Sequence, residues 1–321
     1  MIKPAVVLLM ACAALPALAQ YPERPVRVIV PFAPGGNVDL TARAITPGLA
    51  EQLGRNVVVD NRPGAGGALG AEIVAGASLD GYTLLVGSTG LLSLAPIINS
   101  KLRYDPVKDF APISLISNVS LVMLVNPSSL AKSAQAFAAL AKSRAGQMTM
   151  ASSGNFSTGQ LAGALFQNVT GTRLIHVPYK GASPAVADLI GGHVDVMFDQ
   201  VSSAIGHIRG GKVRALALTA AARSADLPDV PTMREAGIAG VEAGTYTAIL
   251  APAGTPRAIV ARLNGAVAQV LASKPARDSF ARQSAEIMGG TPEAAGAYIR
   301  GEIAKWSKVV REAGIKADQP Q

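Results

Sequence analysis

The sequence predicts an α/β protein of two lobes, each a mostly parallel sheet flanked by helices, with two crossing strands as the hinge. Short β-branched runs alternate with helical stretches through both halves of the 321-residue chain. No flexible linker or low-complexity tract separates the halves, so the chain is expected to pass between the lobes within strands. Open α/β sheets bind ligands at the carboxyl ends of their strands, which favours a ligand site between the lobes.

The first half has a β-α-β-α-β order, which predicts a parallel sheet with right-handed crossovers. Residues 26–30 are short and β-branched and indicate a strand, and Asp39 is the expected N-cap of the helix that follows. The other elements expected here are a strand at 57–59, a helix at 68–77 and a strand at 83–86.

The alternation restarts after a strand-like run at residues 121–125. The pattern predicts helices at 133–144, 159–168 and 184–189, and strands at 148–151, 174–177, 194–198 and 214–218. A second crossing is expected within 241–250, and the C-terminal region is helical. We therefore assign residues 20–121 and 247–321 to lobe 1, and residues 122–246 to lobe 2.

The N-terminus is typical of a secretory signal peptide. Lys3 precedes an apolar run at residues 5–15, and residues 17–19 fit the small-x-small cleavage pattern. We expect residues 1–19 to be removed before Gln20, which predicts export to the periplasm. Cys12, the only cysteine, is an alternative lipidation site because residues 9–12 loosely resemble a lipobox.

Composition narrows the function classes. The formal net charge is +8, which can steer anions at long range, or can equally represent an ordinary solvated surface. No Lys/Arg block occurs, so nucleic acid is not an expected partner. Aromatic residues make up 4% of the chain, which argues against stacking grooves for single-stranded nucleic acid.

Two loops have the composition of an anion site. Residues 34–37 (Pro-Gly-Gly-Asn) lie between a strand and a helix, where glycines let backbone N–H groups and the positive helix end approach a ligand. An ordinary glycine turn is the alternative. Residues 152–158 also join a strand to a helix, and their hydroxyls and amide can bond a carboxylate or a bridging water. Facing each other across a cleft, the two loops would form a closing clamp.

Sequence motifs for chemistry are mostly missing. The three histidines are isolated, and neither H-E-x-x-H nor G-x-S-x-G occurs. Residues 64–69 resemble a dinucleotide fingerprint but have Leu69 at the third position. Asp195 and Asp199 lie near a strand end as a possible acid pair, with a ligand contact or a cap as the alternative. No catalytic residue, metal or cofactor is expected.

From about residue 21 to residue 316 the chain resembles the substrate-binding proteins of tripartite tricarboxylate transporters, the Bug family. Several short motifs carry this resemblance, and their common order leaves little room for chance. They are residues 30–36 (VPFAPGG) with Asp39, 61–67 (NRPGAGG), 80–85 (DGYTLL), 104–106 (YDP) with Asp109 and Phe110, 176–181 (HVPYKG), 227–232 (LPDVPT), 251–256 (APAGTP) and Trp306.

The resemblance implies a two-lobed, type II-like periplasmic binding protein fold and no reaction. It implies capture of a small carboxylate (a di- or tricarboxylate, an amino acid or an aromatic acid) for uptake through integral-membrane permease subunits, by a protein that acts as a monomer. A sensor for a signalling partner is an alternative, and a periplasmic hydrolase or a purely structural protein are others. The implied ligand-binding residues are Phe32, Gly35, Gly36, Asn37, Asp39 and Ser88, then Ser153, Gly154, Asn155 and Thr158, and further Tyr179, Gly181, Ala182 and Asp199.

The chain departs from the family pattern at several positions. Phe156 stands where small residues are common, Gln160 where histidine is frequent, and Tyr246 where tryptophan is frequent. Residues 91–94 (LLSL) are more apolar than usual. Phe156 and these leucines favour a ligand with a less polar tail, such as an aromatic or aliphatic carboxylate.

Overall fold

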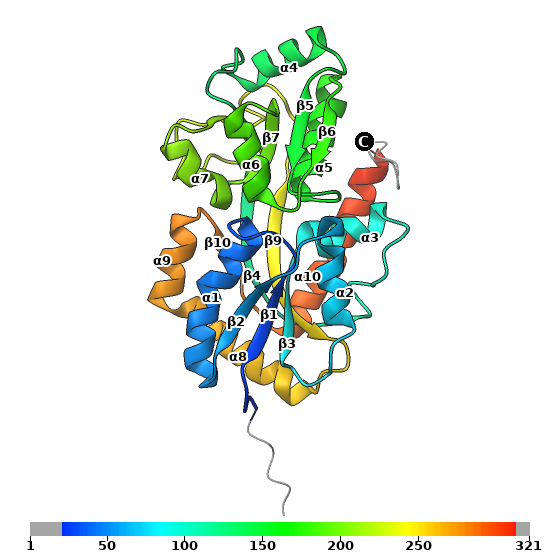
Figure 1. Ribbon diagram of the computed structural model, residues 1–321, viewed down its shortest axis with the longest axis vertical. Coiled ribbons are helices and arrows are strands. Elements are labelled where there is room, and N and C mark those ends of the chain that lie inside the picture. The colour runs from blue at the N-terminus through cyan, green and yellow to red at the C-terminus, as the bar shows by residue number, and fades with distance from the viewer. Residues whose placement is uncertain (1–20, 313–321) are drawn as a thin grey trace, which may run out of the picture.

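The computed structural model describes residues 21–312 and has two lobes stacked end to end (Figure 1). The fold class predicted from the alternation of strands and helices is confirmed. The predicted signal peptide, Cys12 and the cleavage before Gln20 lie outside the described residues. Within residues 21–312, no helix has the length and apolar character needed to cross a membrane.

Lobe 1 is built on a sheet whose strand order is β2–β1–β3–β9–β4. The outer three strands, β2 (Val57–Asn61), β1 (Val26–Val30) and β3 (Thr83–Ser88), are parallel, and β9 (Gly244–Pro252) runs antiparallel to β3. Buried side chains pack α1 (Asn37–Leu53), α8 (Arg257–Ala272) and α9 (Lys274–Arg282) on one face. The other face carries α2 (Ala68–Ala75) and the N-terminal half of α10 (Pro292–Glu312).

Lobe 2 repeats this plan with a second parallel set, β7 (Val196–Gln200), β5 (Thr149–Ser152) and β6 (Ile175–Pro178). The helices α4 (Ala134–Ser143) and α5 (Thr158–Thr170) cover one face around a buried trio of Phe137, Phe166 and Phe198. The helices α6 (Ala182–Gly191) and α7 (Val201–Arg209) cover the other face. The strand β8 (Arg214–Leu218) pairs with β4.

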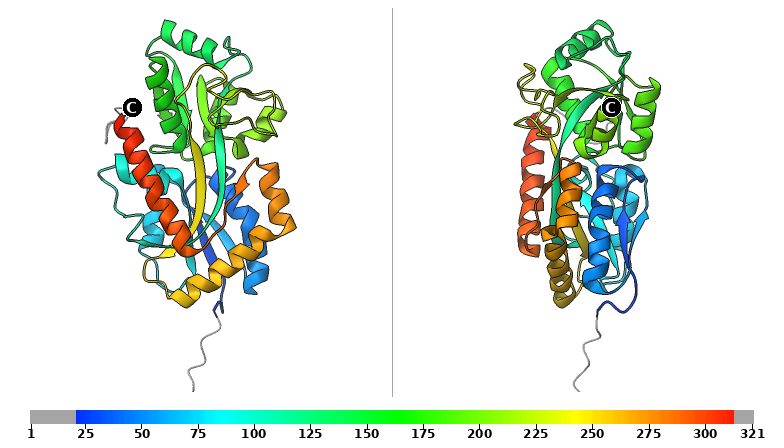
Figure 2. Two further views of the ribbon diagram at one scale, coloured as in Figure 1. Left: turned by 180° about the vertical axis from the view of Figure 1, so that it is seen from behind. Right: turned by 90° about the vertical axis from the view of Figure 1, so that its left-hand side faces the viewer.

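Two long strands cross between the lobes, as predicted. The first part of β4 (Phe110–Val125) pairs with β9 up to Ser120, and its last five residues pair with β7 and β8. Hydroxyl contacts join the crossing strands: the side-chain oxygens of Ser117 and Thr247 are 2.9 Å apart. Figure 2 shows α10 running along the back of both crossing strands.

The structure extends the predicted elements and corrects one of them. Sequence patterns indicate only residues 121–125 of β4, because its first part mixes proline and polar residues with apolar ones. They also miss α7, the π-helical turn η2 (Gly90–Leu94), the short helices η1 (Ala65–Gly67) and α3 (Ala95–Ile98) and the two-residue strand β10 (Glu286–Ile287). The N-cap of α1 is Gly36, so the prediction that Asp39 caps this helix is wrong.

The phenylalanine trio predicts where lobe 2 is most sensitive to substitution. Phe166 is fully buried, with ring centroids 6.2 Å from Phe137 and 5.7 Å from Phe198. We expect Phe166→Ala to lower the free energy of unfolding by about 3–5 kcal/mol, measured by denaturant titration, because it leaves a cavity. The control Leu130→Ala, at a side chain that is 76% exposed, should change it by less than about 0.5 kcal/mol. Equal effects of the two substitutions would contradict this assignment of the core.

Candidate functional site

A cavity of about 30 Å³ lies where the two lobes meet. Both lobes and one crossing strand contribute to its wall, and no described residue that lines it carries a charge. The lining residues are Phe32, Gly36, Asn37, Val38 and Ser88 of lobe 1, Ser153, Ser157, Thr158, Ala182 and Gln200 of lobe 2, and Thr245 of β9. A second space of about 30 Å³ shares Phe32 and Ser153 with it and is also lined by Tyr179, Lys180 and the glycine-rich segment 64–67.

Four helices begin at this cavity. The caps or first residues of α1 (Gly36, Asn37), α5 (Ser157, Thr158), α6 (Ala182) and α7 (Gln200) all line its wall. Each helix follows a strand or a loop at the carboxyl end of its sheet, so the topology brings the four starts together. Helix N-termini carry unpaired N–H donors and partial positive charge, so together they favour an anion without any cationic side chain.

Asn37 adds a buried donor to this wall. Its side chain is 4% exposed, and its Oδ1 accepts a hydrogen bond from the Ser202 hydroxyl of lobe 2 at 2.6 Å. Its Nδ2 has no partner among the described residues. An unsatisfied buried donor costs about 1–3 kcal/mol, and a carboxylate oxygen in the cavity would remove that cost.

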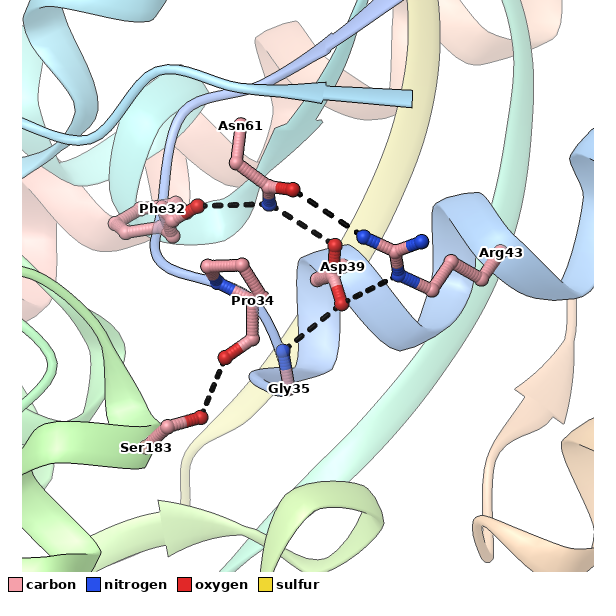
Figure 3. A network of polar contacts seen from close by, with 7 residues as sticks. All are labelled: Phe32, Pro34, Gly35, Asp39, Arg43, Asn61 and Ser183. Carbon is pink, nitrogen blue, oxygen red and sulfur yellow. Dashed lines mark hydrogen bonds and ion pairs between the residues drawn. The ribbon is translucent and has the colours of Figure 1, made fainter. Parts of the chain in front are cut away.

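Asp39 organises the first loop from behind (Figure 3). Its Oδ2 accepts from the Gly35 backbone N–H at 2.8 Å and from Arg43 Nε at 2.9 Å, and its Oδ1 accepts from Asn61 Nδ2 at 2.9 Å. The Asn61 amide also donates to the carbonyl of Phe32 at 3.0 Å. Burial raises the pKa of Asp39, but these hydrogen bonds and the charge of Arg43 outweigh it and hold the pKa below its ordinary value. Asp39 is therefore ionised and acts as a positioning residue.

The lobes touch each other directly around the cavity. The Ala33 N–H donates to the carbonyl of Lys180 at 3.0 Å, and the Ser183 hydroxyl donates to the carbonyl of Pro34 at 2.6 Å (Figure 3). Gly90 is equally close to the other lobe: a Cβ there would lie 2.9 Å from the carbonyl oxygen of Phe156. These short contacts between the lobes describe a closed arrangement.

Comparison with known proteins identifies the family. A model described as the tripartite tricarboxylate transporter family receptor matches residues 41–315. The chain belongs to this receptor family. Its members are periplasmic substrate-binding proteins, and the predicted resemblance is confirmed.

Individual relatives agree with this assignment. Protein BugT of Bordetella pertussis is 40% identical over 301 residues, which is 92% of this receptor and 91% of BugT. The structure of MatC from Rhodopseudomonas palustris with bound malate is 36% identical and has a TM-score of 0.87, covering 90% of this chain and 100% of MatC. A structure of another R. palustris protein with adipate is 35% identical, with a TM-score of 0.89 and coverages of 92% and 99%.

Half of the predicted ligand-binding residues line the cavity of this receptor: Phe32, Gly36, Asn37, Ser88, Ser153, Thr158 and Ala182. Tyr179 lines the neighbouring space. The contacts between the lobes and between their loops involve four more of the predicted residues, Gly35, Gly154, Asn155 and Gly181. The two predicted acids, Asp39 and Asp199, are buried behind the cavity wall. The predicted ligand-binding residues do not include Val38, Ser157, Gln200 and Thr245. Ser157 belongs to the second loop, which is predicted as an anion site from its hydroxyls, whereas Gln200 and Thr245 carry no local signal.

The apolar departures from the family pattern lie elsewhere. Leu91 and Leu92 are fully buried in the lobe 1 core, and Leu94 is fully buried in the cluster that contains Phe166. Phe156 packs against that same cluster. None of these side chains lines either interlobe space, so they give no support to a ligand with an apolar tail.

Asp199 is a buried acid one residue before the cavity-lining Gln200. It is 1% exposed, its Oδ2 accepts from the Ser203 hydroxyl at 2.7 Å, and its Oδ1 has no partner among residues 21–312. Burial raises its pKa to about 6, against the smaller opposing effect of hydrogen bonds from Ser203 and the Gln200 backbone. The folded protein thus holds this proton more tightly than the unfolded chain.

This shift predicts a pH-dependent effect of Asp199→Asn. Because the folded protein binds the Asp199 proton more tightly, this group contributes stability that is fully present below pH 3.8. That contribution is lost as the pH rises through about 6. At pH 7.5 we expect the variant to be more stable than wild type by up to about 3 kcal/mol, since one pKa unit corresponds to about 1.4 kcal/mol. The gain should shrink steadily between pH 6 and pH 4. Chemical denaturation across this range tests it, and a gain independent of pH would refute it.

Proposed function

We propose that this protein captures a small carboxylate between its lobes in the periplasm and delivers it to a tripartite tricarboxylate-type permease. One observation carries the proposal: four helix starts and the unpartnered Asn37 amide meet at a cavity with uncharged walls. Such a wall suits an anion held by neutral donors. The relatives MatC, with malate, and the adipate-bound R. palustris protein support the same ligand class.

Capture requires the lobes to move. A cavity of about 30 Å³ holds a water or two, whereas small-molecule sites typically measure about 300–1,000 Å³. The ligand therefore enters an open form, in which the contacts from Ala33 to Lys180 and from Ser183 to Pro34 are broken. Its carboxylate then bridges the helix starts of both lobes and shifts the population towards closure.

We further propose, from the family resemblance and the sequence, that the mature chain begins at Gln20 and acts as a monomer without cofactor or metal. It docks on integral-membrane permease subunits. Lobe 1 comprises residues 20–121 and 247–321, and lobe 2 residues 122–246. Signalling to a sensor remains the alternative use of the same closed form.

The proposal also includes binding without reaction. Ser152 Oγ lies 2.7 Å from His176 Nε2, a spacing that a hydrolase uses for its nucleophile and base. This serine is fully buried, donates to the Gly154 carbonyl at 2.9 Å and lines neither interlobe space, so it suits a brace for the second loop. Ligand recovered chemically unchanged after prolonged incubation is the expected result.

Asn37→Asp tests the site directly. The substitution keeps the size of the side chain but replaces the free donor with a carboxylate that repels an anionic ligand. We expect calorimetric titration of the wild type to find binding of malate, adipate or another small carboxylate, and the variant to bind about 100-fold more weakly. The control Asn168→Asp, an exposed position on α5, makes the same charge change and should leave the affinity unchanged.

Two results would overturn the proposal. One is an Asn37→Asp variant that binds the carboxylate as tightly as wild type. The other is a ligand-free wild type that binds none of the dicarboxylates, tricarboxylates, amino acids or aromatic acids offered to it.

Gly90→Ala tests closure without touching the cavity wall. Gly90 starts the helical turn η2, and an added Cβ would meet the other lobe, 2.9 Å from the Phe156 oxygen and 3.3 Å from the Cα of Ser157. We expect carboxylate affinity to fall at least 10-fold while the unfolding free energy of the ligand-free protein stays within about 0.5 kcal/mol of wild type. Gly265→Ala, with no atom within 4 Å of the added Cβ, is the control. Unchanged affinity in Gly90→Ala would show that ligand binding does not need this closed form.

A further inference from the structure

A second, larger hollow lies at the foot of lobe 1, at the end remote from lobe 2. It has a volume of about 740 Å³, and its lining residues belong mainly to α8, the start of α10 and the beginning of β4. Figure 2 shows α8 and the start of α10 next to each other in lobe 1. We call this hollow the α8/α10 groove. It shares no residue with the interlobe cavity, and its size falls within the range of small-molecule sites.

The floor of the α8/α10 groove is apolar. Its partly exposed aliphatic lining includes Ala111 and Pro112 of β4, Ala261 of α8 and Pro292 of α10, and the side chains of Val260 and Ile299 are buried beneath it. Such a surface, recessed and large enough for a ligand body, gains free energy when water leaves it, at about 25 cal/mol for each Å² covered.

Hydrogen bonds hold the walls of the groove in place. The Asn264 amide of α8 donates to the carbonyls of Ile113 and Gly290, both at 2.8 Å, and the Ser114 hydroxyl donates to the same Gly290 carbonyl at 3.2 Å. These bonds tie α8 to β4 and to the segment that precedes α10. The groove is therefore formed before any ligand arrives, which lowers the ordering cost of binding.

Two arginines stand at the rim of the groove. Arg257 and Arg300 are both exposed, and neither forms an ion pair with any residue in the described range 21–312. Arg257 is the first residue of α8, whose first turn has no acid, so it adds a cation where the helix end is already positive. The guanidinium of Arg300 folds back over Gly296: a Cβ there would lie 3.3 Å from its Nη1. The acid on the rim, Glu293, pairs with neither arginine.

We propose that the α8/α10 groove is a second binding site, for an organic acid with an apolar body. The anionic group of this ligand lies between Arg257 and Arg300, and its apolar body covers the floor around Pro112, Ala261 and Pro292. This lining differs from that of the interlobe cavity, which has no charged residue and which we propose to hold a small carboxylate by neutral donors. Because the two sites share no lining residue, the groove binds its ligand without competing with the transported carboxylate. This second binding activity is additional to the proposed function.

Fluorescence titration with 8-anilinonaphthalene-1-sulfonate, an anion with an aromatic body, and displacement by decanoate test the site on the mature chain. We expect saturable binding that Arg257→Glu/Arg300→Glu weakens at least 10-fold. Lys142→Glu/Arg144→Glu makes the same charge change at exposed residues around the end of α4 and should leave binding unchanged. Ala261→Phe fills the groove without altering charge and should also weaken binding.

The result of this probe-binding test can be distinguished from the result of the carboxylate-binding test of the interlobe cavity. Asn37→Asp should bind the probe as wild type does, because Asn37 does not line the groove. Circular dichroism and thermal unfolding of each variant confirm that it is folded. Probe binding that survives both Arg257→Glu/Arg300→Glu and Ala261→Phe, or that is lost in Asn37→Asp, overturns the proposal.

Discussion

The free N–H groups at the starts of four helices are the constraint around which this structure is arranged. Helices α1, α5, α6 and α7 all begin at the interlobe cavity, so their unpaired donors and positive ends meet in one small volume. The acid behind the first loop is kept from cancelling this potential, because Arg43 neutralises the carboxylate of Asp39. The site thus stays attractive to an anion although its own wall has no cation.

The two lobes approach each other closely because few side-chain atoms lie between them. Ala33, Pro34 and Gly90 of lobe 1 meet backbone or small polar groups of Lys180, Ser183 and Phe156 in lobe 2. Contacts of this kind have a narrow range of distance, so the interface is either made or broken, as a two-state element requires. The crossing strands β4 and β9 join the lobes, and hydroxyl contacts such as that between Ser117 and Thr247 hold these two strands side by side.

The fold and both anion loops could be predicted from sequence because their signals are local. Strand periodicity, glycines and hydroxyl residues identify the loops at residues 34–37 and 152–158, which do bring Gly36, Asn37, Ser153 and Thr158 to the cavity. Gln200 and Thr245 could not be found this way. They are 45 residues apart, and the bond between them, 3.1 Å from Gln200 Nε2 to Thr245 Oγ1, exists only once β9 crosses beside the end of β7. The sequence predicts Asp39 as the cap of α1, but Gly36 has the extended backbone of the cap, and the Asp39 carboxylate accepts a hydrogen bond from the Gly35 N–H instead.

An uncharged wall also explains how a strongly basic protein can release its ligand. The formal charge of +8 acts at long range and raises the rate at which anions arrive, and salt screens this effect over about 10 Å. A buried ion pair between a cation at the cavity and the ligand can couple the two by about 1.5–7 kcal/mol, and such a pair acts mainly by slowing dissociation. Neutral donors such as the Asn37 amide discriminate by position instead, since each is satisfied only by an oxygen at the right distance and angle. The overall positive charge thus attracts anions at long range, whereas the neutral donors at the cavity recognise them at contact. Opening the lobes separates the donors of lobe 1 from those of lobe 2 and so weakens binding, while the long-range attraction persists.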